Sequence, residues 1–140
     1  MKLQLVTLLG VKVDADVYEV ILPTKDGEIA VFPGHEPLVG IAVSGAIAVR
    51  HNKGDADSSL EYFAISGGVI EIDQHNVRVL VDEADNGEDI IEAESKAALE
   101  RALKMRENAS SQVEIEKANQ LVDRHAVRLK VADLRRRHRH

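Results

Sequence analysis

The feature that most constrains this chain is where its turn-forming residues lie. All nine glycines occur at or before Gly87, and all three prolines occur at or before Pro37. The four aromatic residues lie in the same part, and none of these residue types occurs from Glu88 to His140. Because Gly and Pro mark turns and interrupt helices, the first part favours short strands and the second favours long helices. A single, evenly mixed α/β domain is therefore disfavoured.

The pattern of residues 1–87 predicts an antiparallel β-sandwich. Short runs alternate between apolar and polar residues, and turn signals such as Asp26-Gly27 and Pro33-Gly34 separate them. These signals recur at roughly the 8–12-residue spacing that is typical of sandwiches and barrels. The strands expected most clearly cover residues 2–6, 17–22, 28–32, 46–50, 60–65, 69–72 and 77–81. Pro23 is expected to end the second of them.

Residues 88–140 predict an antiparallel hairpin of two helices. Asp89 with Glu92, and Ser111 with Glu114, have the spacing of N-terminal capping boxes. A short break around Asn108 turns the second helix back along the first, and each helix would be about 30 Å long at 1.5 Å per residue. The predicted fold class is therefore α+β, with a sandwich over residues 1–87 and a helical hairpin over residues 88–140.

The predicted hairpin has little apolar material at its centre. The residues expected on its inner faces are Ile91, Ala98, Ala102 and Met105 in the first helix and Ile115, Ala118, Val122, Leu129 and Ala132 in the second. Alanine permits close approach of helices but removes little apolar area from water. Two interpretations stay open: a hairpin that can leave the sandwich without unfolding it, and a hairpin that is permanently folded down.

Charge divides at the same boundary. Residues 1–87 hold 6 Lys/Arg against 14 Asp/Glu, a net charge of −8, whereas residues 88–140 hold 12 against 10, a net charge of +2. Because a nucleic-acid binder needs a basic face, the acidic sandwich excludes that class of partner. The last seventeen residues hold seven bases and one acid. This basic end either contacts an acidic protein surface or is a solvated helix end.

No catalytic centre, metal site or cofactor site is predicted. The chain has no cysteine and no G-x-S-x-G motif, and its six histidines form no metal-ligand motif such as H-E-x-x-H. The segment Ser66-Gly67-Gly68 lacks the Lys-Ser/Thr of a phosphate-binding loop. No apolar run approaches the roughly 18–20 residues that span a bilayer. We therefore expect a mature cytosolic or membrane-peripheral protein.

The densest local signal is the segment from Pro23 to Val39. It contains a strand, a tight turn, a second strand and a loop bracketed by Pro33 and Pro37. Because proline fixes φ and also restrains the preceding residue, this loop is expected to be stiff. A stiff polar loop is suited to contact a partner, and a rigid corner of the sandwich is the equal alternative.

Residues Pro23 to Leu38 resemble the signature P-T-x-D-G-E-I-G-V-L-P-G-H-A-P-L of the epsilon subunit of bacterial and chloroplast F-type ATP synthases. The three positions that differ are Ala30, Phe32 and Glu36, in place of Gly, Leu and Ala. A second match covers residues 65–72 and continues over residues 76–84. The opening strand and the helical pair fit in order and length, so that the resemblance covers essentially the whole chain.

The resemblance implies a ten-stranded sandwich with a C-terminal hairpin, in a non-catalytic subunit of the central rotor stalk that needs no cofactor. The implied partners are the gamma subunit, the c-subunit ring, and the beta and alpha subunits of the catalytic head. The hairpin would alternate between a folded-down form and a form extended into the head, which inhibits ATP hydrolysis. The chain would be attached to the membrane only through the complex, at the cytoplasmic side of the bacterial plasma membrane or at the stromal side of the thylakoid.

The same resemblance assigns partner contacts to individual residues. Those facing the c-ring would be Glu28, Gly34, His35, Glu36 and Pro37. Those approaching the catalytic head in the extended form would be Ser110, Ser111, Arg124 and Arg128. The positive charge of the second helix suits contact of the two arginines with an acidic region of the beta subunit.

Some members of this family bind ATP on the folded hairpin through a motif that resembles (I/L)-D-x-x-R-A. The corresponding stretch is residues 90–95, in which Ile91 replaces the acid and Glu94 replaces the arginine. Because Glu94 would repel phosphate, we expect weak or absent ATP binding by the isolated chain.

Two other functions stand as alternatives. One is a free-standing sandwich adaptor with a helical oligomerisation tail, which would not co-purify with a membrane ATPase. The other is a small hydrolase that uses His35 with Glu28 or Glu36, and only the closeness of these residues in the sequence supports it.

Overall fold

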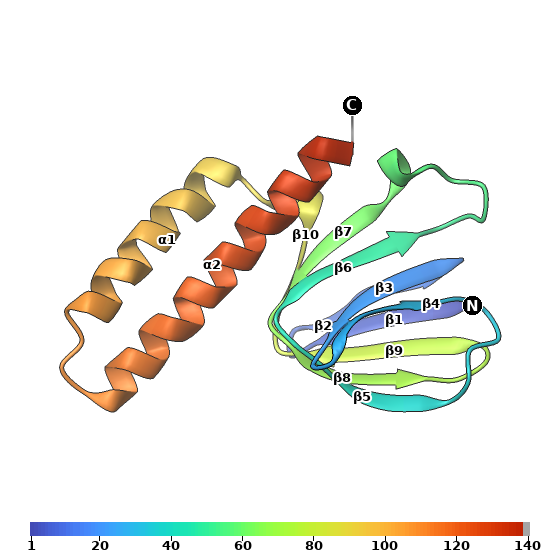
Figure 1. The fold of residues 1–140 in the computed structure, drawn as a ribbon, viewed down its shortest axis with the longest axis horizontal. Helices are drawn as coiled ribbons and strands as arrows, with labels where there is room; N and C mark the ends of the chain where they lie inside the picture. Colours follow the sequence, from blue (N-terminus) through green and yellow to red (C-terminus); the bar gives the residue numbers. More distant parts are fainter. Residues whose placement is uncertain (139–140) are drawn as a thin grey trace.

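The computed structural model describes the backbone of residues 1–138 and the side chains of residues 1–137. Ten strands precede two α-helices, so the predicted α+β class is confirmed (Figure 1). The strands are β1 (Lys2–Thr7), β2 (Gly10–Asp16), β3 (Glu19–Thr24), β4 (Gly27–Val31), β5 (Leu38–Ala42), β6 (Gly45–Arg50), β7 (Glu61–Ile65), β8 (Gly68–Ile72), β9 (Asn76–Val81) and β10 (Ala84–Asn86). The helices are α1 (Glu92–Glu107) and α2 (Gln112–His138), and short 3₁₀ helices lie at Asp57–Ser59 and Gly87–Asp89.

The strands form one continuous sheet that folds over on itself as a sandwich. Their order is β10-β7-β6-β3-β5-β8-β9-β1-β2, and β4 pairs with β3. Among the described strands the pairing is antiparallel except between β1 and β9, which run parallel. The N-terminal strand therefore lies inside the sheet, between β9 and β2.

The core lies between the two halves of the folded sheet. Alternate strand residues point inward, as the period of a β-strand requires. The largest fully buried side chains there are Leu3, Leu5, Leu22, Ile47, Ile70, Val20, Val31, Val49, Val77 and Val79. All of them are aliphatic, and Phe63 adds one aromatic ring to the buried cluster. Removal of this apolar surface from water is the main stabilising contribution in a sandwich of this size.

Pro23 does not end its strand, contrary to the prediction. It lies within β3 and is in register with Glu28 of β4. The Pro23 carbonyl accepts a hydrogen bond from Val43 N at 3.0 Å. Because the N and the carbonyl of one strand residue point to the same side, the missing N–H faces the side where β3 exchanges its neighbour β6 for β5. A proline is tolerated there because no regular ladder bond is lost.

The first helix begins later than predicted. Asp89 ends a 3₁₀ turn whose N-terminus is capped by the Asn86 side chain, which accepts from Glu88 N at 2.9 Å. Helix α1 then starts at Glu92 with Ile91 at the N-cap position and no side-chain cap. The predicted Asp89–Glu92 capping box is therefore wrong. The two helices also differ in length, about 24 Å for α1 and about 40 Å for α2 at 1.5 Å per residue.

Helix α2 lies between α1 and the sandwich, and the hairpin is folded down onto the sheet (Figure 1). The C-terminal half of α2 packs on β6 and β7, whereas the loop between the helices points away from the sandwich. Ala102 and Ala118, predicted on the inner faces, are buried. Ile91 and Met105, predicted there as well, are exposed, at 57% and 47%. Ile91 misses the face because α1 starts only after it.

Candidate functional site

The hairpin–sandwich interface is the contact of α2 with β6, β7 and the segment from Glu83 to Ile90. The buried residues at its centre are Ala48, Tyr62, Ala64, Ile90, Val131 and Ala132. Half of these six are alanine, which buries little apolar area. The apolar contact is therefore thin, and polar contacts surround it.

Two arginines of α2 pair with acids of the sandwich. Arg124 Nε lies 2.9 Å from Glu83 Oε2, and Arg128 Nη2 and Nε lie 2.9 and 3.0 Å from Asp85 Oδ2. The Arg124 contact is an ion pair without an aligned hydrogen bond, whereas Arg128 donates to Asp85. Arg124 and Arg128, predicted to contact the catalytic head, are thus both engaged within the chain in this form. Partly exposed pairs of this kind contribute about 0.2–1 kcal/mol each.

The last turns of α2 hold the start of the hairpin in place. Arg135 Nη1 donates to the carbonyl of Gly87 at 2.6 Å. Gly87 lies so close to α2 that an added Cβ would stand 3.1 Å from Val131. Arg136 Nη1 lies 3.1 Å from a Glu92 oxygen, which joins the end of α2 to the start of α1. The arginines of the basic run from Arg124 to Arg137 therefore each contact a carboxylate of this chain, and Arg139 lies outside the described residues.

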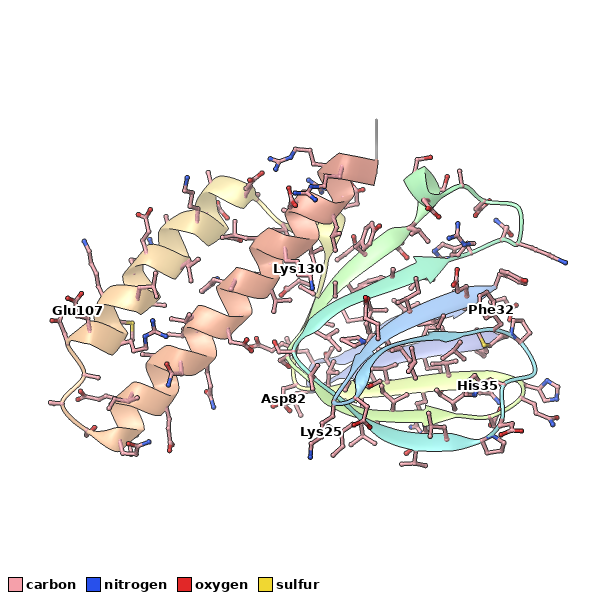
Figure 2. All side chains as sticks on the ribbon, viewed as in Figure 1. Lys25, Phe32, His35, Asp82, Glu107 and Lys130 are labelled. Atoms are coloured by element: carbon pink, nitrogen blue, oxygen red, sulfur yellow. The ribbon has the colours of Figure 1, made fainter. Side chains whose placement is uncertain are left out.

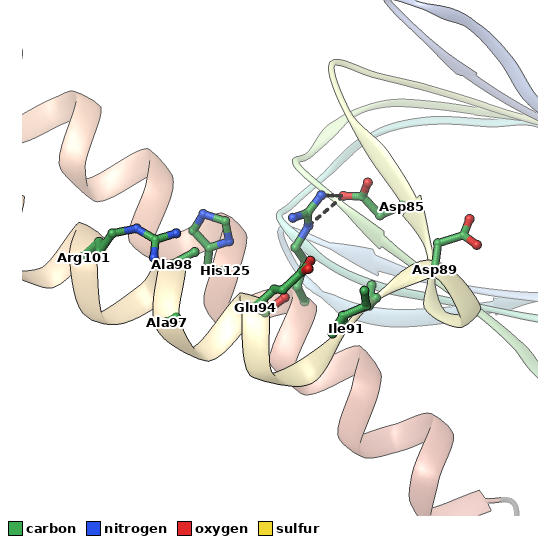
Figure 3. A pocket seen from close by; sticks show the side chains of 11 residues that line it. Asp85, Asp89, Ile91, Glu94, Ala97, Ala98, Arg101 and His125 are labelled. Atoms are coloured by element: carbon green, nitrogen blue, oxygen red, sulfur yellow. Dashed lines mark hydrogen bonds and ion pairs between the residues drawn. The ribbon is translucent and has the colours of Figure 1, made fainter.

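An open hollow of about 490 Å³ lies beside the ion pairs, between α1, α2 and the connector to α1 (Figure 3). The charged and titratable residues that line it are Asp85, Asp89, Glu94, Arg101, His125 and Arg128. Burial, followed by the charges of Arg128, Arg124 and Arg101, lowers the pKa of His125 below its ordinary 6.5. Its Nδ1 is shut off from water and has no hydrogen-bond partner among the described residues.

The residues of the degenerate ATP motif lie at this hollow. Glu94 lines it, and so does Ile91, whose side chain is mostly exposed. Three carboxylates face the space, and Arg128 is already paired with Asp85. A triphosphate placed there would meet these carboxylates, so weak or absent ATP binding remains the prediction.

The proline-bracketed loop lies at the end of the sandwich away from the hairpin, where Figure 2 labels Phe32 and His35. Gly34 adopts a φ of 87°, which favours glycine, and its N donates to Gln74 O at 2.9 Å. The His35 ring contacts the Glu36 carbonyl, with Nδ1 2.7 Å from that oxygen. The loop is thereby fixed against the β8–β9 turn, and Glu36 and Pro37 are exposed on it.

Glu28 does not lie with the other predicted c-ring residues. It is the second residue of β4, and Gly34 follows the other end of that strand. At about 3.3 Å per residue the two positions are roughly 20 Å apart. The structure therefore brings Gly34, His35, Glu36 and Pro37 together and leaves Glu28 at the opposite end, next to Lys25. The hydrolase alternative would pair His35 with the carboxylate of Glu28 or Glu36. Among the described contacts, the His35 ring meets Glu36 only through its backbone carbonyl and does not meet Glu28.

Ser110 and Ser111 lie in the loop between the helices, at the end of the hairpin remote from the sandwich. Ser111 Oγ accepts from Glu114 N at 3.2 Å, as the predicted capping box requires. The Glu114 carboxylate accepts from Ser110 N at 2.9 Å rather than from Ser111 N. The hydrogen bonds from Ser110 N and Ser110 Oγ to the carboxylate lower the pKa of Glu114. The second capping box is confirmed, with its return bond displaced by one residue.

Sequence reasoning missed an apolar row on the outer face of the sheet. The row crosses five neighbouring strands in register and consists of Ile41, Val69, Leu80, Val6 and Val11. Ile41, Val69 and Val11 are exposed at 59%, 41% and 61%. Val11 reaches this face because Lys12 has no partner in the β1–β2 register, so that the alternation of β2 changes there. The signal that could have found the row is the apolar side chain at outward strand positions.

A polar row lies beside the apolar row on the same face. Glu71, Arg78, Gln4 and Asp14 follow one another across β8, β9, β1 and β2. The exposed Val39 faces Glu71 from β5. A contiguous apolar surface with a polar border is the usual appearance of a protein–protein contact site.

Comparison with known proteins identifies the family. The family model of the beta-sandwich domain of ATP synthase delta/epsilon chains matches residues 1–87. An ATP synthase epsilon chain of Staphylococcus haemolyticus is 35% identical over 86% of this chain and 86% of its own length. The chain belongs to the ATP synthase epsilon-chain family. Another epsilon chain, from Anoxybacillus flavithermus, is 42% identical over 72% of each chain. The relatives are thus subunits of an enzyme complex, the ATP synthase.

Solved structures share the epsilon-chain fold. A chain in the Euglena gracilis mitochondrial ATP synthase, in a structure of OSCP, F1 and the c-ring, has a TM-score of 0.75 at 22% identity. The match covers 93% of this chain and 79% of that chain. At this identity the likeness shows the fold alone. In residues 1–138 no helix is long and apolar enough to cross a membrane. The described side chains form no cluster of three or more His, Asp or Glu that could hold a metal ion.

Proposed function

We propose that this epsilon chain is a non-catalytic subunit of the central stalk, in which residues 1–87 couple rotation and residues 88–140 regulate ATP hydrolysis. The observation that carries the coupling role is the bare apolar row on the sandwich. Three of its five members are exposed although they are Val or Ile. In an assembled central stalk this row would be the contact with the gamma subunit, because burial there removes it from water.

The proline-bracketed loop is the proposed contact with the c-ring. Gly34, His35, Glu36 and Pro37 lie together at the end of the sandwich opposite the hairpin (Figure 2). The backbone bond from Gly34 to Gln74 and the two prolines hold the loop, so a contact there costs little conformational entropy. Glu28 is not part of this contact, because it lies at the other end of β4. Attachment through the stalk would place the chain at the cytoplasmic side of the plasma membrane.

The hairpin is the proposed inhibitor of ATP hydrolysis. Its thin apolar contact and partly exposed ion pairs permit release without unfolding of the sandwich core, which shares no residue with the interface. Release would free Arg124 and Arg128 from Glu83 and Asp85. The two arginines would then pair with an acidic region of the beta subunit, with Ser110 and Ser111 in the leading loop. Glu83 and Asp85 thus compete with the catalytic head for the same cations.

The test uses an assembled ATP synthase in which this subunit lacks its hairpin. Deletion of residues 88–140 should leave assembly nearly intact and raise ATP hydrolysis by the complex. Unchanged hydrolysis would mean that the hairpin is only structural. The matched variant keeps the hairpin and carries Glu83→Gln with Asp85→Asn, which removes both docking acids. It should lower hydrolysis, because it favours the extended form.

A further inference from the structure

Arg78 is an arginine of the sandwich that the fold leaves without a partner. The only other arginine in this part of the sequence is Arg50, whose side-chain nitrogens lie 2.9 Å from Glu19 Oε1 and 2.7 Å from Asp57 Oδ1. Arg78 forms no ion pair and no side-chain hydrogen bond with any residue that the structure describes. A guanidinium has five N–H donors and is always charged, so Arg78 is an unused binding group on the outer face of the sheet.

Arg78 occupies the middle of the part of the sheet that carries the apolar row. It lies on β9, with β8 and β5 on one side and β1 and β2 on the other (Figure 1). Its side chain is exposed between the buried Val77 and Val79, so it points to the outer face. Leu80 of the apolar row is two residues farther along the strand, about 7 Å away. A partner that covers the row therefore also reaches Arg78.

The acids nearest to Arg78 leave its guanidinium without a carboxylate contact. Glu71 is opposite it in register on β8, but the two side chains form no ion pair. Asp14, two strands away, is paired with Lys2 at 3.2 Å. The Asp73 carboxylate accepts from two backbone N–H groups of its own turn, both at 2.8 Å. An acceptor for Arg78 therefore has to come from outside the described part of the chain.

An open hollow of about 490 Å³ lies beside Arg78 and has room for a side chain of a partner. The apolar residues Pro37, Leu38 and Val39 line it as well, so that a partner there meets both apolar surface and a cation. Residues 1–87 carry a net charge of −8, from 6 bases against 14 acids. This charge repels nucleic acid and anionic membranes, whereas a protein held by apolar contacts can place a single acid at this point.

We propose that Arg78 binds a carboxylate of the partner that covers the apolar row, and that this ion pair sets how the partner is placed on the sheet. The inference rests on the proposed function, because the row is taken as the contact with the gamma subunit and the acid then belongs to that subunit. Apolar burial is not directional, whereas a charge pair fixes the register of two surfaces. A carboxylate fits because its two oxygens accept from two N–H groups of one guanidinium.

The experiment measures binding of the full-length chain to its ATP synthase from which this subunit has been removed. The chain has no cysteine of its own, so Lys53→Cys in the exposed loop between β6 and β7 takes a dye whose anisotropy reports binding. Arg78→Gln should weaken binding about tenfold, and Arg78→Glu should weaken it further, because the partner's acid is then repelled. Since Arg78 is exposed in the isolated chain, both variants should unfold at the urea concentration of the unsubstituted chain.

Two controls separate a specific pair from other effects of charge. Lys25→Gln removes the same charge from the exposed turn between β3 and β4 and should bind normally. A loss equal to that of Arg78→Gln would show that only the net charge matters and would contradict the proposal. Glu71→Gln should bind no more weakly than the unsubstituted chain. If it binds as weakly as Arg78→Gln, Arg78 pairs with Glu71 in the assembled state, and the proposal is wrong.

Charge exchange identifies the acid of the partner. Acids of the gamma subunit are replaced by lysine one at a time, and each complex is tested with Arg78→Glu. One replacement should restore binding of Arg78→Glu and weaken binding of the chain that keeps Arg78. The absence of any such position, or normal binding of Arg78→Gln, would overturn the proposal.

Val69→Lys distinguishes failure of this inference from failure of the proposed function, because it tests the apolar row itself. Weak binding of Val69→Lys with normal binding of both Arg78 variants would contradict the ion pair alone. Normal binding of Val69→Lys with weak binding of Arg78→Gln and rescue by charge exchange would support the ion pair and contradict the apolar contact.

Discussion

Gly68 shows at the scale of one residue how closely the strands of this sandwich approach. A Cβ built there would stand 1.9 Å from the backbone oxygen of Leu80. Gly68→Ala would therefore separate β8 from β9, and we expect a loss of about 3 kcal/mol in the free energy of unfolding. Urea unfolding of the purified chain measures this loss. Gly54→Ala is the control, because its Cβ would meet nothing within 4 Å, and a loss as small as the control's would contradict the prediction.

The family resemblance and the charge of the second helix singled out two residues of the candidate site. Arg124 and Arg128 were predicted to contact the catalytic head, which stays a prediction, and the structure places both in ion pairs with acids of the sandwich. Their partners Glu83 and Asp85 could not be predicted, because partners 41 and 43 residues away in the sequence leave no local pattern. His125 likewise looked unremarkable, since its surroundings depend on how α1, α2 and the connector pack.

At the scale of elements, the start of α2 gives the next prediction. Ser111 Oγ accepts from Glu114 N, and this bond satisfies one of the free N–H groups of the first turn. Ser111→Ala should therefore destabilise the first turn of α2 by about 1 kcal/mol. Amide hydrogen exchange of the residues after Ser111 reports the change as faster exchange. Val113→Ala alters the same turn without touching the cap and should not speed amide exchange. Equal exchange rates in the two variants would contradict a stabilising role for the Ser111 cap.

Elements with clear alternation were predicted best, and the misses have physical causes. β5 was not predicted as a separate strand because Leu38 to Ala42 holds no polar residue and therefore shows no alternation. The alternation is hidden because the outward-facing Val39 and Ile41 are apolar as well. The start of α1 was placed too early because Asn86 caps a 3₁₀ turn that precedes the helix. Pro23 was predicted to end its strand because proline lacks the N–H that a regular ladder needs. The sequence does not show that β3 changes its neighbour from β6 to β5 at this point, so that no ladder bond is lost.

At the scale of the whole molecule, the apolar row is the proposed contact with the gamma subunit. Val69→Lys places a charge in the middle of the row, on a side chain that already faces water. The isolated chain should unfold at nearly the same urea concentration, whereas assembly with the gamma subunit should fall at least tenfold, because a buried lysine there has no partner. Co-purification with the stalk measures assembly. Leu103→Lys changes an exposed leucine of α1 and should assemble normally; normal assembly of Val69→Lys as well would contradict the assigned contact.

The row could not be predicted without the three-dimensional register. Its five members come from five strands, and the unpaired Lys12 decides the side on which Val11 lies. A sequence pattern shows which residues share a face of one strand, but the neighbours across the sheet follow from topology. The proline-bracketed loop was easier to predict, because all of its residues are contiguous.

The parallel pairing of β1 with β9 also sets the order in which the chain can be completed during its synthesis. Lys2 to Val6 pairs with the neighbouring β2 on one edge, but its parallel partner on the other edge lies at residues 76–80. A nascent chain therefore carries its first strands with one edge open until most of the sandwich has left the ribosome. Such long-range closure slows folding relative to local hairpins. The hairpin of α1 and α2 emerges after the sandwich, so the surface of β6 and β7 on which α2 packs is already made when the hairpin reaches it.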